Sequence, residues 1–234
     1  MKKIKKLLGI VLALALVINI SFGLTCTKVD AASNVAYVWI ASCTSGTTGH
    51  AFIAVKNVSS TNIVVGLRPL GPGKIVTLGT YGNLEDGQCL YYNVEKYCMN
   101  DSNANNNYTP NKYIGEYITS SELSTLNSTI NSHTSWSLSY NCAGFAADCW
   151  NSFSDRTLSA NSFFIANQYY WSPVTLPSYL AINIEQQSSY STNLSISGSC
   201  SSGEVYYQPT STSYGTASLD TIDLLTSSSE SIGS

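Results

Sequence analysis

The sequence predicts an α+β fold in which an antiparallel β-meander packs against one central helix with a cysteine at its start. Two observations indicate this fold. In the first half of the chain, short segments of β-branched and aromatic residues alternate with turn residues. Further along, apolar residues recur with helical spacing, which is typical of a helix packed into a core. This stripe falls at offsets 0, 3, 4, 7, 8 and 11 and consists of Cys142, Phe145, Ala146, Cys149, Trp150 and Phe153.

The predicted meander occupies the first third of the chain. Its strands are expected where β-branched and aromatic residues gather, over residues 35–42, 50–56, 62–67 and 75–81. Turn residues separate the later strands at 57–61 and at 71–74, the latter with the sequence Gly-Pro-Gly-Lys. Strands joined by such short turns are expected to pair with their neighbours in sequence.

Helices are predicted in the second half of the chain. A polar loop over 99–111 precedes a helix that starts near Ser120, with a Ser or Thr cap and Glu122 in its first turn. The helix that carries the apolar stripe is expected over 142–154. Another helix is expected to begin near Pro177.

The chain is expected to contain three segments. Residues 1–31 read as a secretory signal peptide, because lysines precede a mostly apolar run and small residues lead to a cut before Ala32. An uncleaved membrane anchor is the alternative, and polar Asn19 and Ser21 disfavour it. Residues 32–187 form the predicted α+β domain. Residues 188–234 form a Ser/Thr-rich C-terminal extension with one strand near Val205 and a disordered end.

Cleavage of the signal peptide leaves an acidic, exported protein. The chain has 11 Lys and Arg against 14 Asp and Glu. Residues 1–31 hold five of the basic residues and one acidic residue, so 6 basic and 13 acidic residues remain, a charge near −7. No basic stripe is left, which argues against a nucleic-acid partner. No stable membrane span is expected after cleavage.

Cysteines allow two opposite interpretations. Six remain after cleavage, and an even number in an exported chain suggests disulfides. Cys89 with Cys98, and Cys43 with Cys200, are possible pairs. Cys142 and Cys149 cannot bridge each other, since they lie about 10 Å apart along a straight helix. If Cys142 is instead a free thiol, Cys149 is the residue expected to stay unpaired and buried beside it.

Cys142 is the candidate nucleophile. At a helix start, the unpaired N–H groups and the helix dipole favour a thiolate. Such a cysteine needs a histidine, and the chain has two. His50 opens a predicted strand and is the candidate base, which takes the thiol proton and returns it to a leaving group. His133, in a polar stretch before Cys142, is the competitor. The plain alternative for His50 is a hydrogen-bonded strand residue without catalytic role.

Two short motifs carry a resemblance to a known group. Gly-His-Ala-Phe-Ile at 49–53 and Asn-Cys-Ala-Gly-Phe at 141–145 resemble the circularly permuted papain-like cysteine hydrolases. That group includes the lecithin:retinol acyltransferase family and permuted relatives of bacterial cell-wall endopeptidases. There a strand histidine precedes a cysteine that begins a helix as Asn-Cys-x-x-Phe. The resemblance implies a papain-like domain over 32–187, a thioester on Cys142, and an amide, ester or lipid acyl substrate.

The group usually has a third polar residue, on the strand after the histidine, that orients the imidazole. In the predicted meander, Asn62 would lie more than about 15 Å from His50 by strand rise. Arg68 falls in the right region but cannot accept a hydrogen bond from imidazole. A backbone carbonyl, or Thr77 on a third strand, is therefore the candidate orienting group.

An oxyanion hole is expected at the helix start. The Cys142 N–H is one natural donor, and Tyr140 and Asn141 are candidates for a second. No other catalytic pattern is found. The chain lacks a Gly-x-Ser-x-Gly elbow, a phosphate loop and a Cys-x-x-Cys pair, so no cofactor and no metal are expected.

The sequence therefore predicts a secreted, papain-like cysteine hydrolase of the thiol protease type, or an acyltransferase. It is expected to act through Cys142 and His50 on extracellular amide or ester bonds in a peptide, lipid or cell-wall substrate. The alternative is a non-catalytic extracellular domain that binds glycan or protein, which the 16 tyrosines favour. The state of the Cys142 thiol separates the two.

Overall fold

The computed structural model describes most of the chain after residue 32. The described residues are 33–43, 49–82, 89–100, 110–137, 139–166, 170–196, 198, 200–210 and 213–216. The expected signal peptide, most of the expected polar loop and the expected disordered end lie outside them. Among the described residues, no helix has the length and apolar character needed to cross a membrane.

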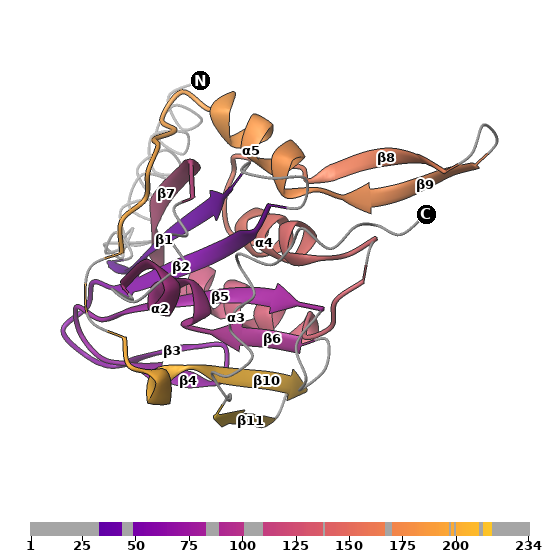
Figure 1. The fold of residues 1–234 in the computed structure, drawn as a ribbon. Helices are drawn as coiled ribbons and strands as arrows, with labels where there is room; N and C mark the ends of the chain where they lie inside the picture. Colours follow the sequence, from indigo (N-terminus) through magenta and orange to yellow (C-terminus); the bar gives the residue numbers. More distant parts are fainter. Residues whose placement is uncertain are drawn as a thin grey trace, which may run out of the picture. The chain divides into compact units, whose positions relative to one another are not determined.

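One antiparallel sheet of seven strands organises the fold (Figure 1), in the order β11-β10-β6-β5-β2-β1-β7. Every pair of neighbours is antiparallel. The strands are β1 Asn34–Ser42, β2 Ala51–Asn57, β5 Ile75–Tyr81, β6 Cys89–Tyr92, β7 Lys112–Thr119, β10 Tyr206–Thr210 and β11 Ser213–Thr216. With the helices packed on it, this sheet makes the mixed α+β fold that was predicted.

Helices cover both faces of the sheet. They are α2 Val94–Asn100, α3 Ser120–Ser132, α4 Cys142–Asn151 and α5 Pro177–Glu185, with a short 3₁₀ turn at Ser202–Glu204. The cluster formed by α3, α4 and α5 includes Ile53 and Val55 of β2, whereas the cluster that includes α2 contains Phe52 and Ala54. Because successive side chains of a strand point to opposite faces, β2 is buried on both sides.

The expected central helix is α4, and its apolar stripe is buried. Phe145, Ala146, Cys149 and Trp150 are all 0% exposed. Asn141 caps the helix by accepting the Ala143 N–H at 3.0 Å. The helix ends at Asn151 rather than near residue 154. There the Asn151 side chain exchanges two hydrogen bonds with the Leu158 backbone, which turns the chain back.

The expected helix near Ser120 is also confirmed, as α3. Thr119 accepts the Glu122 N–H and the Glu122 carboxylate accepts the Thr119 N–H, a capping box that fixes the helix start. Leu123, Leu126 and Ile130 form its buried face.

The pairing predicted for the meander is wrong at one place. The strand expected over 62–67 does not pair with β2, whose two neighbours are β1 and β5. Ala54 of β2 lies opposite Thr77 of β5. The intervening segment forms a separate hairpin of β3 (Ile63–Val65) and β4 (Arg68–Leu70). The Asn57 side-chain amide donates to the Thr61 carbonyl at 2.7 Å and to the Leu70 carbonyl at 2.8 Å. These bonds hold the two ends of the β3–β4 segment together, so the segment forms its own hairpin beside the main sheet.

The strand expected near Val205 is confirmed as β10. It is not part of a separate extension, because β10 pairs with β6 inside the main sheet and β11, which was not predicted, follows it. A further hairpin that was not predicted, β8 Asn161–Ala166 and β9 Tyr170–Thr175, follows α4. Its last residue, Thr175, contacts the start of α4.

Candidate active site

His50 is held at the entrance to β2 by the end of β1. The Cys43 N–H donates to the His50 carbonyl at 2.8 Å. Gly49 makes this approach possible. Its φ is +43°, and a Cβ there would lie 2.3 Å from the Cys43 carbonyl oxygen. The His50 residue is only 6% exposed, so its imidazole is surrounded mainly by protein groups.

Cys142 is the first residue of α4 and a buried free thiol. Helix α4 packs against β2 and β5, which brings its N-terminus to the His50 end of β2. The Cys142 sulfur lies near enough to the His50 imidazole to raise the pKa of the ring, through its charge and side-chain hydrogen bonding. The two residues that sequence analysis singled out are therefore in contact, although 92 positions separate them.

Glu95 on α2 is the residue that orients the imidazole. Its Oε1 lies 2.8 Å from the His50 Nε2, and the carboxylate is fully buried. The Tyr81 hydroxyl donates to the same oxygen at 2.7 Å, and the Tyr81 ring stacks on the imidazole at 4.6 Å between centroids. With Nε2 committed to Glu95, Nδ1 is the nitrogen left for Cys142.

Gly79 provides the space in which His50 and Glu95 meet. It lies on β5, and a Cβ at this position would fall 2.2 Å from the Glu95 Oε1 and 2.9 Å from the His50 Nε2. Any larger residue would push the carboxylate off the imidazole. The pairing of β2 with β5 therefore places Gly79 beside the His50 and Glu95 side chains.

The charges around His50 favour its protonated form. Burial lowers the pKa of His50, but the Cys142 sulfur and the Glu95 carboxylate outweigh it and raise the pKa to about 10. The imidazole of His50 is thus a cation between the Cys142 sulfur and the Glu95 carboxylate.

The raised pKa of His50 predicts how its protonation and the stability of the protein depend on pH. The His50 ring should stay protonated at pH 8 and titrate near pH 10, as followed by the NMR signal of its Cε1 carbon. Because the folded pKa exceeds the unfolded value of about 6.5, the stabilisation from this proton is complete below pH 6.5. It is lost as the pH rises through about 10.

His133→Gln assigns the signal, since only one other histidine is present. Cys142→Ala should move the titration to lower pH. A wild-type His50 that titrates near 6.5 would contradict the pair.

Thr77, the predicted orienting residue, uses its hydroxyl at another place in the structure. The Thr77 Oγ1 accepts the Lys96 N–H at 3.3 Å and so helps to position α2. The orienting position belongs to Glu95 instead. Sequence reasoning missed this residue because no helix was predicted at 94–100, and one carboxylate in a seven-residue helix carries no periodic signal.

Tyr140 and Asn141, the predicted oxyanion donors, hold the start of α4. The Asn141 side chain accepts from Ala143 and from the Thr175 hydroxyl and donates to the Thr175 carbonyl. The Tyr140 N–H donates to Ser137, and its hydroxyl donates to Asp148. These contacts are structural. The oxyanion role predicted for the Cys142 N–H rests on its place in the first helical turn, where amides lack partners within the helix.

His133, the competing histidine, lies at the C-terminal end of α3. Its Nδ1 is 3.0 Å from the Thr129 carbonyl oxygen, and its Nε2 is 3.7 Å from the Asp148 carboxylate. The ring stacks on Tyr140. The structure therefore brings His50, and not His133, to Cys142.

Two other thiols, Cys149 and Cys200, are free as Cys142 is. Cys149 is also free and fully buried, and burial raises its pKa well above the usual value. Cys200 is a free thiol as well, so the pairing of Cys43 with Cys200 is not formed. Within the described ranges, no group of three or more His, Cys, Asp or Glu side chains is arranged to hold a metal ion.

The fold and the site define an α+β protein with a buried Cys142–His50–Glu95 triad. No protein-family model matches the chain, and no curated protein or solved structure matches it either.

Proposed function

We propose that this protein is a secreted cysteine hydrolase or acyltransferase of the circularly permuted papain-like type. Cys142 is the nucleophile, His50 the general base and acid, and Glu95 the residue that positions His50. The observation that carries the proposal is the engagement of the buried imidazole on both sides, by a free thiol and by a carboxylate. A merely structural histidine has no need of a free thiol at a helix N-terminus.

The chemistry follows from this arrangement. The Cys142 thiolate attacks the carbonyl carbon of an amide or ester and forms a tetrahedral adduct whose oxygen carries the negative charge. Imidazolium of His50 gives its proton to the leaving amine or alkoxide, and the carbon–nitrogen or carbon–oxygen bond breaks. A thioester on Cys142 remains. His50 then takes a proton from water, or from an acceptor alcohol or amine, which attacks the thioester and frees the Cys142 sulfur.

The order of the triad along the chain supports the permuted type, in which the histidine precedes the cysteine. One feature departs from that pattern, because Glu95 comes from a helix rather than from the strand after the histidine. The carboxylate nevertheless performs the same task, since it fixes the ring orientation and stabilises the imidazolium. The preference for extracellular substrates, cell-wall peptide among them, rests on the predicted signal peptide.

A trapped acyl-enzyme tests the proposal. Incubation with an activated ester such as p-nitrophenyl acetate should release p-nitrophenol in a burst and add one acetyl group to Cys142, located by peptide mass spectrometry. Cys142→Ala should abolish both signals. Cys149→Ala is the matched control, because it removes a thiol from the same helix face and should retain the burst.

Equal turnover by Cys142→Ala and the wild type would refute the assignment. In that case the non-catalytic binding domain would become the better account. Cell-wall peptides and lipid esters, offered in parallel to the active protein, would then distinguish peptidase from acyltransferase substrates.

A further inference from the structure

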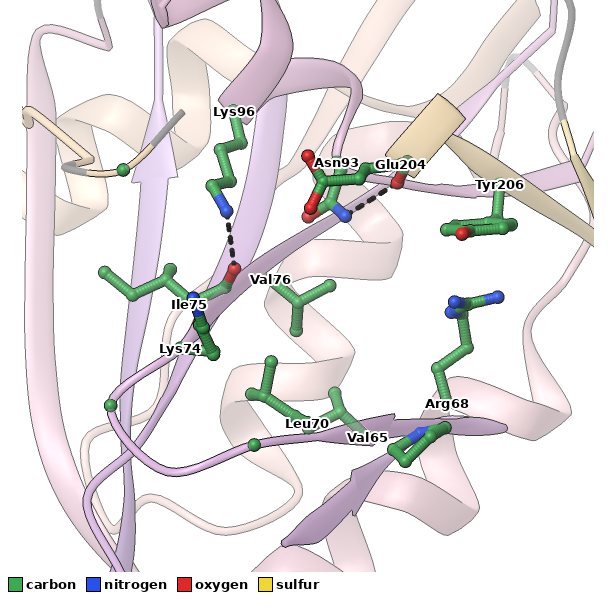
Figure 2. A pocket seen from close by; sticks show the side chains of 14 residues that line it. Val65, Arg68, Leu70, Lys74, Ile75, Val76, Asn93, Lys96, Glu204 and Tyr206 are labelled. Atoms are coloured by element: carbon green, nitrogen blue, oxygen red, sulfur yellow. Dashed lines mark hydrogen bonds between the residues drawn. The ribbon is translucent and has the colours of Figure 1, made fainter. Parts of the chain in front are cut away.

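A second feature of the molecule is a cavity of about 490 Å³ that the proposed chemistry does not use (Figure 2). It lies beside the β3–β4 hairpin, the start of β5 and the turn that precedes β10. Its volume falls within the range of small-ligand sites in proteins. Neither Cys142 nor His50 lines it.

Positive charge is concentrated in this cavity. After residue 32 the chain has six Lys and Arg residues, and three of them, Arg68, Lys74 and Lys96, line the cavity. The rest of that chain is strongly acidic. Among the described residues of the lining, Glu204 is the one carboxylate. These described residues therefore carry a net charge of about +2, in a protein whose overall charge is negative.

The surroundings of the Lys96 ammonium group indicate that it can bind an anionic ligand. The residue is only 8% exposed, and a buried lysine normally has an anionic partner. Among the described residues, the Lys96 Nζ donates one hydrogen bond, to the Ile75 carbonyl at 3.2 Å, and has no carboxylate within salt-bridge distance. An ammonium group has three donors, so two are left for an anion or for water.

Arg68 provides a second cation with a fixed orientation. Its guanidinium carbon lies 3.3 Å from the centroid of the Tyr206 ring. Figure 2 shows this stacked pair on one side of the cavity and Lys96 on the other. A guanidinium held flat against an aromatic ring keeps its plane, and a planar fork of N–H donors suits the oxygens of phosphate or carboxylate.

Glu204 does not neutralise the cavity. Its carboxylate accepts the Ser201 N–H at 2.8 Å, and its backbone carbonyl accepts from the Asn93 side chain. The Ser201 N–H, together with the charges of Lys96 and Lys74, lowers the pKa of Glu204. The carboxylate is thus ionised and directed to the turn that it caps, and among the described lining residues it is one negative charge beside three cations.

We propose that this cavity binds a small dianion, a phosphoryl group or a dicarboxylate, between Lys96 and Arg68, with Lys74 at its edge. Two negative charges match the net charge of the described lining residues. The buried Lys96 ammonium, which forms no ion pair with a described carboxylate, gains an anionic partner. The inference is independent of the proposed hydrolase activity, because the two sites share no residue.

Titration with inorganic phosphate and with succinate, at constant ionic strength, tests the proposal by calorimetry. At least one anion should bind saturably. Binding of phosphate alone identifies a phosphoryl ligand, and binding of succinate identifies a dicarboxylate. Lys96→Met should weaken binding by roughly ten- to hundredfold, because a charged hydrogen-bond donor is lost from a buried site.

Matched variants separate the site from general charge effects. Lys74 is exposed, so Lys74→Met should fold normally and weaken binding by about two- to fivefold. This variant decides the question if Lys96→Met does not fold. Lys112→Met removes a charge from β7, at the opposite edge of the sheet, and Cys142→Ala removes the nucleophile; both should bind as the wild type does.

The proposal is overturned if neither anion binds saturably. It is equally overturned if Lys112→Met weakens binding as much as the cavity variants do. Failure of the hydrolase assays would leave these measurements unchanged, so the two proposals can fail separately.

Discussion

Replacement of His50 by alanine should slow alkylation of Cys142 by iodoacetamide roughly a hundredfold at pH 7. In the wild type, the imidazolium held by Glu95 stabilises the thiolate, which is the reactive form. Without the ring, the buried sulfur loses the group that would accept its proton. The rate is measured by quenching at timed intervals and quantifying the carbamidomethylated Cys142 peptide by mass spectrometry.

Two controls belong to this experiment. Cys149 lies on the same helix but is fully buried with a raised pKa, so it should label far more slowly than Cys142 in every variant. His133→Ala should leave the rate of Cys142 labelling unchanged, because His133 interacts with Asp148 instead. Equal rates in the wild type and in His50→Ala would remove the triad from further consideration.

Trp150→Ala should lower the free energy of unfolding by about 3–5 kcal/mol. Trp150 is the largest fully buried side chain among the described residues, and its indole N–H donates to the Arg156 carbonyl at 2.7 Å. Truncation leaves a cavity between α4 and the sheet and an unpaired carbonyl in the returning chain. Urea denaturation followed by circular dichroism gives the difference.

Trp150→Phe divides this loss into two parts. It keeps most of the apolar ring and removes the N–H, so it should cost less than the alanine variant. Tyr179→Ala, on the exposed face of α5, is the surface control and should change stability by less than about 0.5 kcal/mol. An unchanged urea midpoint in Trp150→Ala would show that α4 is not a core helix. The position of Cys142 at the buried start of that helix would then be wrong as well.

Much of the site could be predicted because its two reacting residues carry local signals. Cys142 begins a stripe of apolar residues with a period of 3.6, and Asn141 before it is a favoured cap. His50 directly precedes a strand whose β-branched and aromatic residues are recognisable without any partner. The pairing of the two was inferred from a motif resemblance, since no local pattern brings together residues so far apart in the chain.

Glu95 could not be predicted in the same way. It reaches His50 only because β2 pairs with β5, β5 pairs with β6, and α2 follows β6. The predicted meander placed another strand beside β2. Alternation along a strand indicates which side chains are buried, but it does not identify the neighbouring strand. The Asn57 side chain binds the end of the β3–β4 hairpin, which forms a separate two-stranded sheet and leaves β5 as the neighbour of β2.

The sequence by itself determined the local elements: the capped helices α3 and α4, their buried faces, the strands β1, β2 and β5, and the candidate pair of cysteine and histidine. These depend on residue spacing and on capping groups a few positions apart, which any short segment reveals. The tertiary structure decided the third member of the triad, the place of β10 in the sheet and the gathering of three cations around one cavity. Each of these is a contact between distant segments, and its free energy arises only when the whole sheet has assembled.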